Sequence, residues 1–285
     1  MTLVRRARRS GDINAQAAGD DGATSGWQSW SGGGCSQSPG PLGETCEQYA
    51  TGNERFYGTY SLHYRSCENP RRAPGRWDGG AWKTSGCNCC TCRDDFKFVR
   101  QLLAWLEGAL CIDRRRVFAV GSSYGAMMAL ALAQADPPLP LAAVVSVSGG
   151  LLKGFHQPLL PTNSSALAVL DLHGRSDTTV PSTVASPSQR WAKSFDGWFY
   201  TPMDDILGAA AVYSGCEPGA ARRAAAWPTP WSRGGQDYRS SDELVCTDVG
   251  GRHCRNGSEV VRCVGPWGHD WPWCAHSHLA ATGAR

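Results

Sequence analysis

The stretch that decides the fold is residues 116–134, RVFAVGSSYGAMMALALAQ. Its first part, Arg116–Val120, is a short apolar run with β-branched and aromatic side chains, which predicts a strand. Its last part, Ala126–Gln134, is rich in small apolar residues and predicts a helix. Between them, Gly121–Gly125 reads GxSxG, so that strand, tight turn and helix follow one another directly. This order predicts a nucleophile elbow, in which a serine is exposed on a strained turn.

Ser123 is the candidate nucleophile of this turn. Gly121 and Gly125 are expected to be required, because the turn strains the serine backbone and brings strand and helix so close that larger side chains would collide. The alternative is a Gly/Ser loop that closes an ordinary βα unit, since short motifs of this kind occur by chance.

The flanking sequence predicts the elements around the elbow. Ala142–Val147, Ala166–Leu172 and Glu259–Val264 are nearly continuous apolar runs separated by helices or long crossings. Such runs are typical of parallel strands that are covered on both faces. Upstream, Asp94–Leu110 carries apolar residues at helical spacing and predicts an amphipathic helix. The fold class is therefore α/β.

A serine nucleophile needs a base, and the base needs an orienting acid; in this fold both follow the serine, in the order Ser, Asp, His. Asp177, in HGRSDTTVP, comes just after a predicted strand and is the candidate acid. Asp171 is its rival, but it lies within the strand, where packing or hydrogen bonding is the expected role. His269, in PWGHDWPW, follows the last predicted strand and is the candidate base.

Three further histidines are expected to take no part in the chemistry. His173, beside Gly174, is expected to be a structural loop residue, and His276 and His278 are expected to be exposed in the C-terminal tail.

Length and charge exclude several classes of function. The 285 residues suit one large domain, and 28 basic against 25 acidic residues give a net charge of only +3. Arg5, Arg6, Arg8 and Arg9 lie together near the start, so the remainder is roughly neutral and no basic groove for nucleic acid is expected. No stretch approaches 18 to 20 uninterrupted apolar residues, so no membrane-spanning helix is expected.

Thirteen cysteines and 34 glycines indicate a disulfide-linked, extracellular protein, and the odd count leaves one cysteine unpaired or paired outside the chain. The irregular segment 28–93 is expected to be tied by disulfides. Its CNCCTC run could bind a metal, but without paired CxxC motifs disulfides are the better interpretation, and neither metal nor cofactor is expected. A second group is expected to form bridges that hold the His269 loop, with the pairing left open. It comprises Cys216, Cys246, Cys254, Cys263 and Cys274.

The start of the chain does not resemble a signal peptide. Residues 1–25 hold four arginines followed by polar residues, with no apolar core, and are interpreted as a disordered tail or an incorrectly chosen start codon rather than a transit peptide. Two predicted N-glycosylation sites, Asn163 in NSS and Asn256 in NGS, nevertheless agree with secretion.

The sequence resembles the secreted α/β-hydrolase esterase family of polyhydroxybutyrate depolymerases and feruloyl or acetylxylan esterases. The resemblance covers residues 26–273 and rests on WDGG, DDFKFVRQLL, CIDRRRVFAVGSSYGAMMA, HGRSDTTVP, DGWFYTPMDDIL and WGHDWP. It implies an α/β-hydrolase domain over 26–275, a mostly parallel sheet with helices on both faces, and a tail over 276–285. The family's nucleophile, acid and base fall on Ser123, Asp177 and His269.

The sequence departs from the family at three points. Tyr124 and Ala126 stand where the family usually has Asn and Gly, although the backbone N–H of Tyr124 can still donate to an oxyanion. The family's early strand and HG loop, the source of a second oxyanion donor, are not found, so the sheet is expected to lack its N-terminal strands.

The resemblance implies a monomeric, extracellular serine esterase. It would act through an acyl-enzyme on plant cell-wall feruloyl or acetyl esters, or on polyesters of the polyhydroxyalkanoate type. The alternative is a catalytically impaired pseudoenzyme or a carbohydrate-binding protein, which would use Trp-rich loops; the chain holds 12 tryptophans.

Overall fold

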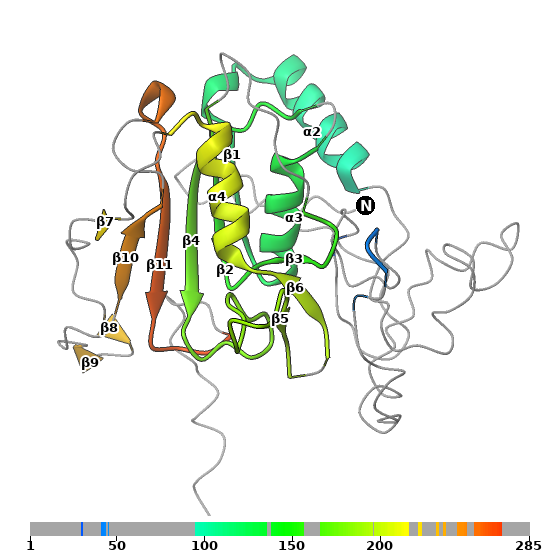
Figure 1. Ribbon diagram of the computed structural model, residues 1–285. Coiled ribbons are helices and arrows are strands. Elements are labelled where there is room, and N and C mark those ends of the chain that lie inside the picture. Colours follow the sequence, from blue (N-terminus) through cyan, green and yellow to red (C-terminus); the bar gives the residue numbers. More distant parts are fainter. Residues whose placement is uncertain are drawn as a thin grey trace, which may run out of the picture.

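The computed structural model describes the part of the chain that holds the predicted strands (Figure 1). The described residues are 30, 41–43, 45, 95–135, 138–156, 166–195, 197–216, 222–223, 232–233, 236–237, 244–249 and 254–269. The CNCCTC run, Asn163, Cys274, His276 and His278 lie outside them, so the predictions made for these residues stay predictions.

A six-stranded sheet, in the order β1-β2-β4-β11-β10-β7, forms the centre of the fold. Its first four strands run parallel, and β10 and β7 are antiparallel to their neighbours. The strands are β1 Phe118–Ser122, β2 Ala143–Val147, β4 Ala168–Gly174, β11 Val260–Gly265, β10 Val245–Asp248 and β7 Arg222–Arg223. The predicted parallel α/β sheet is confirmed, and the predicted apolar runs correspond to its four parallel strands.

Smaller elements complete the described structure. A three-stranded sheet has the order β3-β6-β5, and β8 pairs with β9. Their bounds are β3 Leu151–Leu152, β5 Ala192–Lys193, β6 Phe199–Thr201, β8 Ser232–Arg233 and β9 Gln236–Asp237, with 3₁₀ turns η3 Arg114–Arg116 and η4 Arg255–Gly257.

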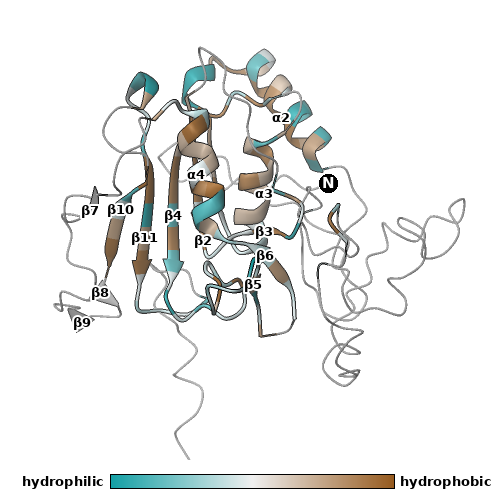
Figure 2. Ribbon diagram, viewed as in Figure 1, coloured by the Kyte–Doolittle hydropathy of each residue, from teal (hydrophilic) through white to brown (hydrophobic). Residues whose placement is uncertain are grey.

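The three α-helices of the described residues follow three different sequence patterns. Helix α2 (Asp95–Ala109) alternates hydrophilic and hydrophobic bands, whereas α3 (Tyr124–Ala133) is hydrophobic throughout (Figure 2). Helix α3 is accordingly buried from Ala126 to Leu132. Helix α4 (Met203–Tyr213) begins after Pro202 with two acidic residues in its first turn, where the helix dipole favours them.

Helices α3 and α4 pack on the same face of the main sheet. Val144, Val169 and Val260, from three adjacent parallel strands, form one core cluster with these two helices. The opposite face carries a second cluster, in which every buried member comes from a strand: Val147, Leu172, Cys246 and Cys263. Helices were predicted on both faces, and within the described residues α3 and α4 cover one.

Strand β1 is the first strand in the order of the described sheet. Its side chains Phe118 and Val120 are 58% and 59% exposed. They alternate with Ala119, which packs into the cluster beneath α3 and α4. The face opposite to those helices is therefore open to solvent at β1.

Within the described residues, two disulfides join elements of the C-terminal half of the chain. Cys246 and Cys263 face each other across β10 and β11 and are bonded. Cys216, just after α4, is bonded to Cys254, just before η4. The predicted bridging of this group is confirmed for these four residues, and Cys111 is free and exposed.

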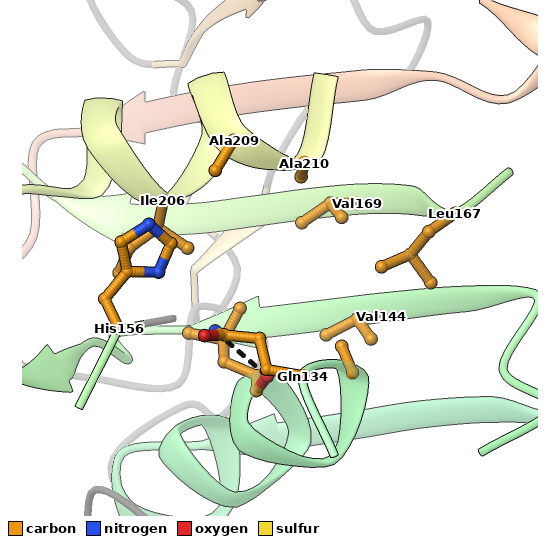
Figure 3. A pocket seen from close by; sticks show the side chains of 10 residues that line it. Gln134, Val144, His156, Leu167, Val169, Ile206, Ala209 and Ala210 are labelled. Atoms are coloured by element: carbon orange, nitrogen blue, oxygen red, sulfur yellow. Dashed lines mark hydrogen bonds between the residues drawn. The ribbon is translucent and has the colours of Figure 1, made fainter. Parts of the chain in front are cut away.

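A cavity of about 20 Å³, which is room for roughly one water, lies between α3 and α4 (Figure 3). Among its mainly apolar lining, Gln134 donates from Nε2 to the Leu130 carbonyl at 3.4 Å. His156 Nδ1 has no hydrogen-bond partner within the described residues. Because these residues lie at the C-terminal end of α3, the cavity is separate from the elbow at its N-terminal end.

Candidate active site

The predicted elbow is present as a strained turn between β1 and α3. Ser123 has φ 53° and ψ −120°, a backbone conformation that non-glycine residues adopt rarely. Its N–H donates to the carbonyl of Val147 at 2.9 Å, and its carbonyl accepts from the N–H of Met127 at 3.0 Å. The turn is therefore fixed on one side by the neighbouring strand β2 and on the other by the first turn of α3.

The two elbow glycines are not equivalent. A Cβ on Gly121 would lie 2.1 Å from the carbonyl carbon and oxygen of Gly125, a distance that no packing tolerates. A Cβ on Gly125 itself would meet no described atom within 4 Å. The prediction that collision requires glycine at both positions therefore holds for Gly121 and is wrong for Gly125, whose backbone is the surface that Gly121 approaches.

Asp177 lies in the loop after β4 and is only 6% exposed. Its Oδ1 accepts hydrogen bonds from the backbone N–H groups of Thr179 at 3.0 Å and Val180 at 2.8 Å. Its own N–H donates to the carbonyl of Gly174 at 3.1 Å. This turn leaves the second carboxylate oxygen, Oδ2, to face the loop that follows β11.

His269 completes a continuous chain of hydrogen bonds. Its Nδ1 is 2.9 Å from Asp177 Oδ2, and its Nε2 is 2.9 Å from Ser123 Oγ. Ser123 lies 146 residues before the histidine in the sequence, and Asp177 lies 92 residues before it. The structure thus brings together the serine, acid and base candidates in the geometry of a hydrolase triad.

The acid and base loops are joined directly through their backbones. Arg175 N–H donates to the Gly265 carbonyl at 2.7 Å, and Ser176 N–H donates to the Trp267 carbonyl at 3.0 Å. A Cβ on Gly174 would lie 2.2 Å from the carbonyl oxygen of Gly268. Because glycine at 174 allows this approach, Asp177 and His269 are held at a fixed separation.

Tyr124 is the first residue of α3 and lies beside the nucleophile. A helix N-terminus attracts negative charge, because the first backbone N–H groups have no partner within the helix. The Tyr124 side chain packs against a cluster that includes Met127, Val180 and Trp198. Its backbone N–H follows the candidate nucleophile directly, at the start of α3.

The rival residues occupy different places. Asp171 is fully buried and lies within β4, as expected, and the carboxylate bonded to His269 is that of Asp177. His173 was expected in a loop, but it lies in β4 itself and is fully buried, with Nε2 only 3.5 Å from Asp177 Oδ2. Sequence reasoning missed this contact and also missed Arg262, whose Nε lies 3.9 Å from Asp171.

Other predicted features lie away from the triad. Asn256, the glycosylation candidate within the described residues, is exposed in η4. Searched over the described residues, the structure holds no group of three or more His, Cys, Asp or Glu side chains arranged to bind a metal. Over the same residues, no helix has the length and hydropathy needed to cross a membrane.

Comparisons with known proteins find similarity over part of this chain. A family model described as phospholipase/carboxylesterase matches residues 94–201, which include Ser123 and Asp177. Feruloyl esterase C from Emericella nidulans is 31% identical over 109 residues, which are 38% of this chain and 36% of that protein. The chain thus aligns with about a third of the length of this relative.

A solved acetyl xylan esterase from Aspergillus awamori matches with a TM-score of 0.37 and 16% identity, covering 65% of this chain and 66% of the other. The parallel sheet defines an α/β fold, and the matches over part of the chain confirm the predicted resemblance to esterases of the α/β-hydrolase fold.

Proposed function

We propose that the protein is a serine carboxylic-ester hydrolase that acts through an acyl-enzyme. The observation that carries this proposal is the unbroken series of hydrogen bonds from Ser123 Oγ through His269 to Asp177, with both links at 2.9 Å. A serine hydroxyl is a weak nucleophile unless an adjacent base removes its proton, and this arrangement supplies that base.

In the proposed reaction, Ser123 Oγ attacks the ester carbonyl while His269 Nε2 takes the hydroxyl proton. Asp177 stabilises the resulting imidazolium and holds its orientation. The negative charge on the former carbonyl oxygen is stabilised by the Tyr124 N–H at the N-terminus of α3. His269 then gives the proton to the departing alcohol, and a water activated in the same way releases the acid and regenerates Ser123.

The proposed substrates are plant cell-wall feruloyl or acetyl esters, or polyesters of the polyhydroxyalkanoate type, met outside the cell. The relation to a feruloyl esterase supports the first class, and the two disulfides of the described residues support an oxidising environment. Rates on methyl ferulate, acetylated xylan and a polyhydroxybutyrate suspension would discriminate among them.

The decisive experiment replaces the nucleophile. Ser123→Ala should lower kcat on a short-chain aryl ester by about 10⁴-fold or more, because removal of one triad member abolishes the covalent route. Ser122→Ala, at the neighbouring residue, is the matched control and should keep the parent rate.

Hydrolysis by Ser123→Ala at the parent rate would refute the proposal. A folded parent that neither hydrolyses esters nor reacts with a fluorophosphonate would favour the impaired, carbohydrate-binding alternative instead.

A further inference from the structure

A second histidine lies behind the candidate triad. His173 is fully buried near the end of β4 and has ring nitrogens that face in opposite directions. Its Nε2 is 2.7 Å from the carbonyl oxygen of Val180, and its Nδ1 is 3.4 Å from Asp171 Oδ1. The reaction proposed above uses neither contact.

Both neighbours of the His173 ring are hydrogen-bond acceptors. The Val180 carbonyl can only accept, so Nε2 must carry a proton. An ionised Asp171 can also only accept, so the cationic ring, with protons on both nitrogens, satisfies both contacts. Burial by itself would lower the pKa of His173, but the charge and hydrogen bond of Asp171, together with the Val180 carbonyl, raise it above its usual value.

The partner of this ring also positions the candidate acid. Val180 receives the His173 hydrogen bond on its carbonyl and donates its own N–H to Asp177 Oδ1 at 2.8 Å. His173 Nε2 lies 3.5 Å from Asp177 Oδ2, the oxygen that faces His269. The His173 ring therefore acts on both carboxylate oxygens of Asp177. It is linked to Oδ1 through the backbone of Val180, and it lies directly beside Oδ2.

The strand next to β4 holds the far end of this arrangement. Arg262 in β11 has Nε 3.9 Å from Asp171 Oδ2, and it uses Nη2 to donate to Ser182 Oγ at 2.8 Å and Nη1 to bond Asp204. Positive and negative groups thus alternate from Arg262 through Asp171 and His173 to Asp177. In a buried site, a neighbouring group of opposite charge offsets part of the cost of burying each charge.

We infer that His173 is a positioning residue of the hydrolase site: by joining Asp171 to the Val180 carbonyl, it fixes the Asp177 turn so that Oδ2 faces His269. This inference rests on the proposed function for its kinetic consequence. His173 touches no reacting atom, and its effect on the rate should come entirely from the orientation of Asp177.

The test compares substitutions that keep or remove the bond to Val180. His173→Leu removes both ring contacts and should lower kcat on a short-chain aryl ester about 10- to 100-fold, since small misplacements of a triad member have effects of that size, with KM within about threefold. His173→Gln can place an amide N–H near the position of Nε2 and should keep kcat within about threefold of the parent. His156→Gln, a histidine change beside the separate cavity, is the matched control and should leave kcat unchanged.

A second readout is independent of turnover. The proton on His269 Nδ1, bonded to Asp177, should give a downfield ¹H NMR resonance in the parent and in Ser123→Ala, and the resonance should move upfield or broaden in His173→Leu. If Ser123→Ala is inactive while His173→Leu keeps both the parent kcat and the resonance, the inference is wrong and the proposed function stands. If the parent itself lacks activity, the proposed function fails, and an unmoved resonance in His173→Leu would overturn the inference separately.

If His173→Leu fails to fold, a comparison of two polar variants tests the inference instead. His173→Asn carries its amide near Nδ1 and does not reach Val180, so its kcat should be below that of His173→Gln. Equal kcat values for these two variants would overturn the inference.

Discussion

The elbow and the acid–base loops position their side chains by different means. Ser123 is held by contacts within a few residues, namely the Gly121–Gly125 approach and the first turn of α3, together with one bond to β2. Asp177 and His269 are held by contacts between loops 92 residues apart in sequence, through Gly174, Trp267 and buried His173. A local steric constraint thus fixes the nucleophile, while a long-range network fixes its partners.

This difference has a consequence for how each region should fail. The elbow has no room to relax, because the atoms that meet are backbone atoms of a strand and a buried helix. The backbone that meets Gly174, at Trp267 and Gly268, lies in the loop after β11, so we expect it to move without unfolding the sheet. A side chain added at Gly121, where the elbow backbones meet, should therefore affect folding and activity together, and substitution in the loops should affect activity first.

The largest effect is expected at Gly121. Gly121→Ala places a Cβ 2.1 Å from the backbone of Gly125, so β1 and α3 must separate, and the free energy of unfolding should fall by about 3 kcal/mol with loss of activity. Gly125→Ala is the matched control: it meets no described atom and lies in a helix, where Ala is favoured over Gly by about 1 kcal/mol. Urea unfolding of both variants measures the difference, and equal destabilisation would show that the elbow is not a local steric device.

An intermediate effect is expected at Gly174, where the two loops meet. A Cβ there would lie 2.2 Å from the Gly268 carbonyl oxygen, so the His269 loop must move away from Asp177. We expect kcat to fall about 10²-fold, with a loss of unfolding free energy of about 1 to 2 kcal/mol. Gly108→Ala in α2, where a Cβ meets no described atom, should leave kcat unchanged. A Gly174→Ala variant that unfolds as readily as Gly121→Ala would remove the distinction between the two regions.

The same difference explains what the sequence could predict. The elbow was predictable because five adjacent residues, between two clear apolar patterns, determine its steric constraints. Asp177 and His269 were predictable from their places after strands, because the C-terminal ends of parallel strands meet at one edge of the sheet. The fit between the loops was not, since Gly174 and Trp267 become neighbours only after β4 and β11 pair.

Among the features that escaped prediction, three did so for different physical reasons. Strand β10 has four residues, two of them polar, and it is defined by its pairing with β11 and the Cys246–Cys263 bond. Helix α4 did carry a signal, Pro202 followed by acidic residues and apolar residues at helical spacing. His173 was predicted in a loop, because its acceptors, Asp171 and the Val180 carbonyl, come next to its ring only in the folded protein.

The smallest effect is expected from the pH dependence of stability, which separates the buried network from the rest of the core. His173 has a raised pKa, set by burial opposed by the stronger combined effect of Asp171, the Val180 carbonyl and Asp177, with Arg262 beyond Asp171. His156 has a lowered pKa, because burial outweighs the attraction of Asp205. The two histidines should therefore give the stability curve opposite slopes.

The folded protein binds the His173 proton more tightly than the unfolded chain, whose histidines titrate near 6.5. The stabilisation from His173 is thus complete below that pH and is lost as the pH rises through its raised pKa. At His156 the folded protein binds the proton more weakly, so stability falls as the pH drops below 6.5.

Urea unfolding of the parent, His173→Gln and His156→Gln from pH 5 to 9 measures both contributions. The advantage of the parent over His173→Gln should shrink toward high pH, and its advantage over His156→Gln should shrink toward low pH. A difference from His173→Gln that stays constant with pH would mean that the ring carries no extra proton in the fold, and that the Val180 hydrogen bond alone holds the Asp177 turn.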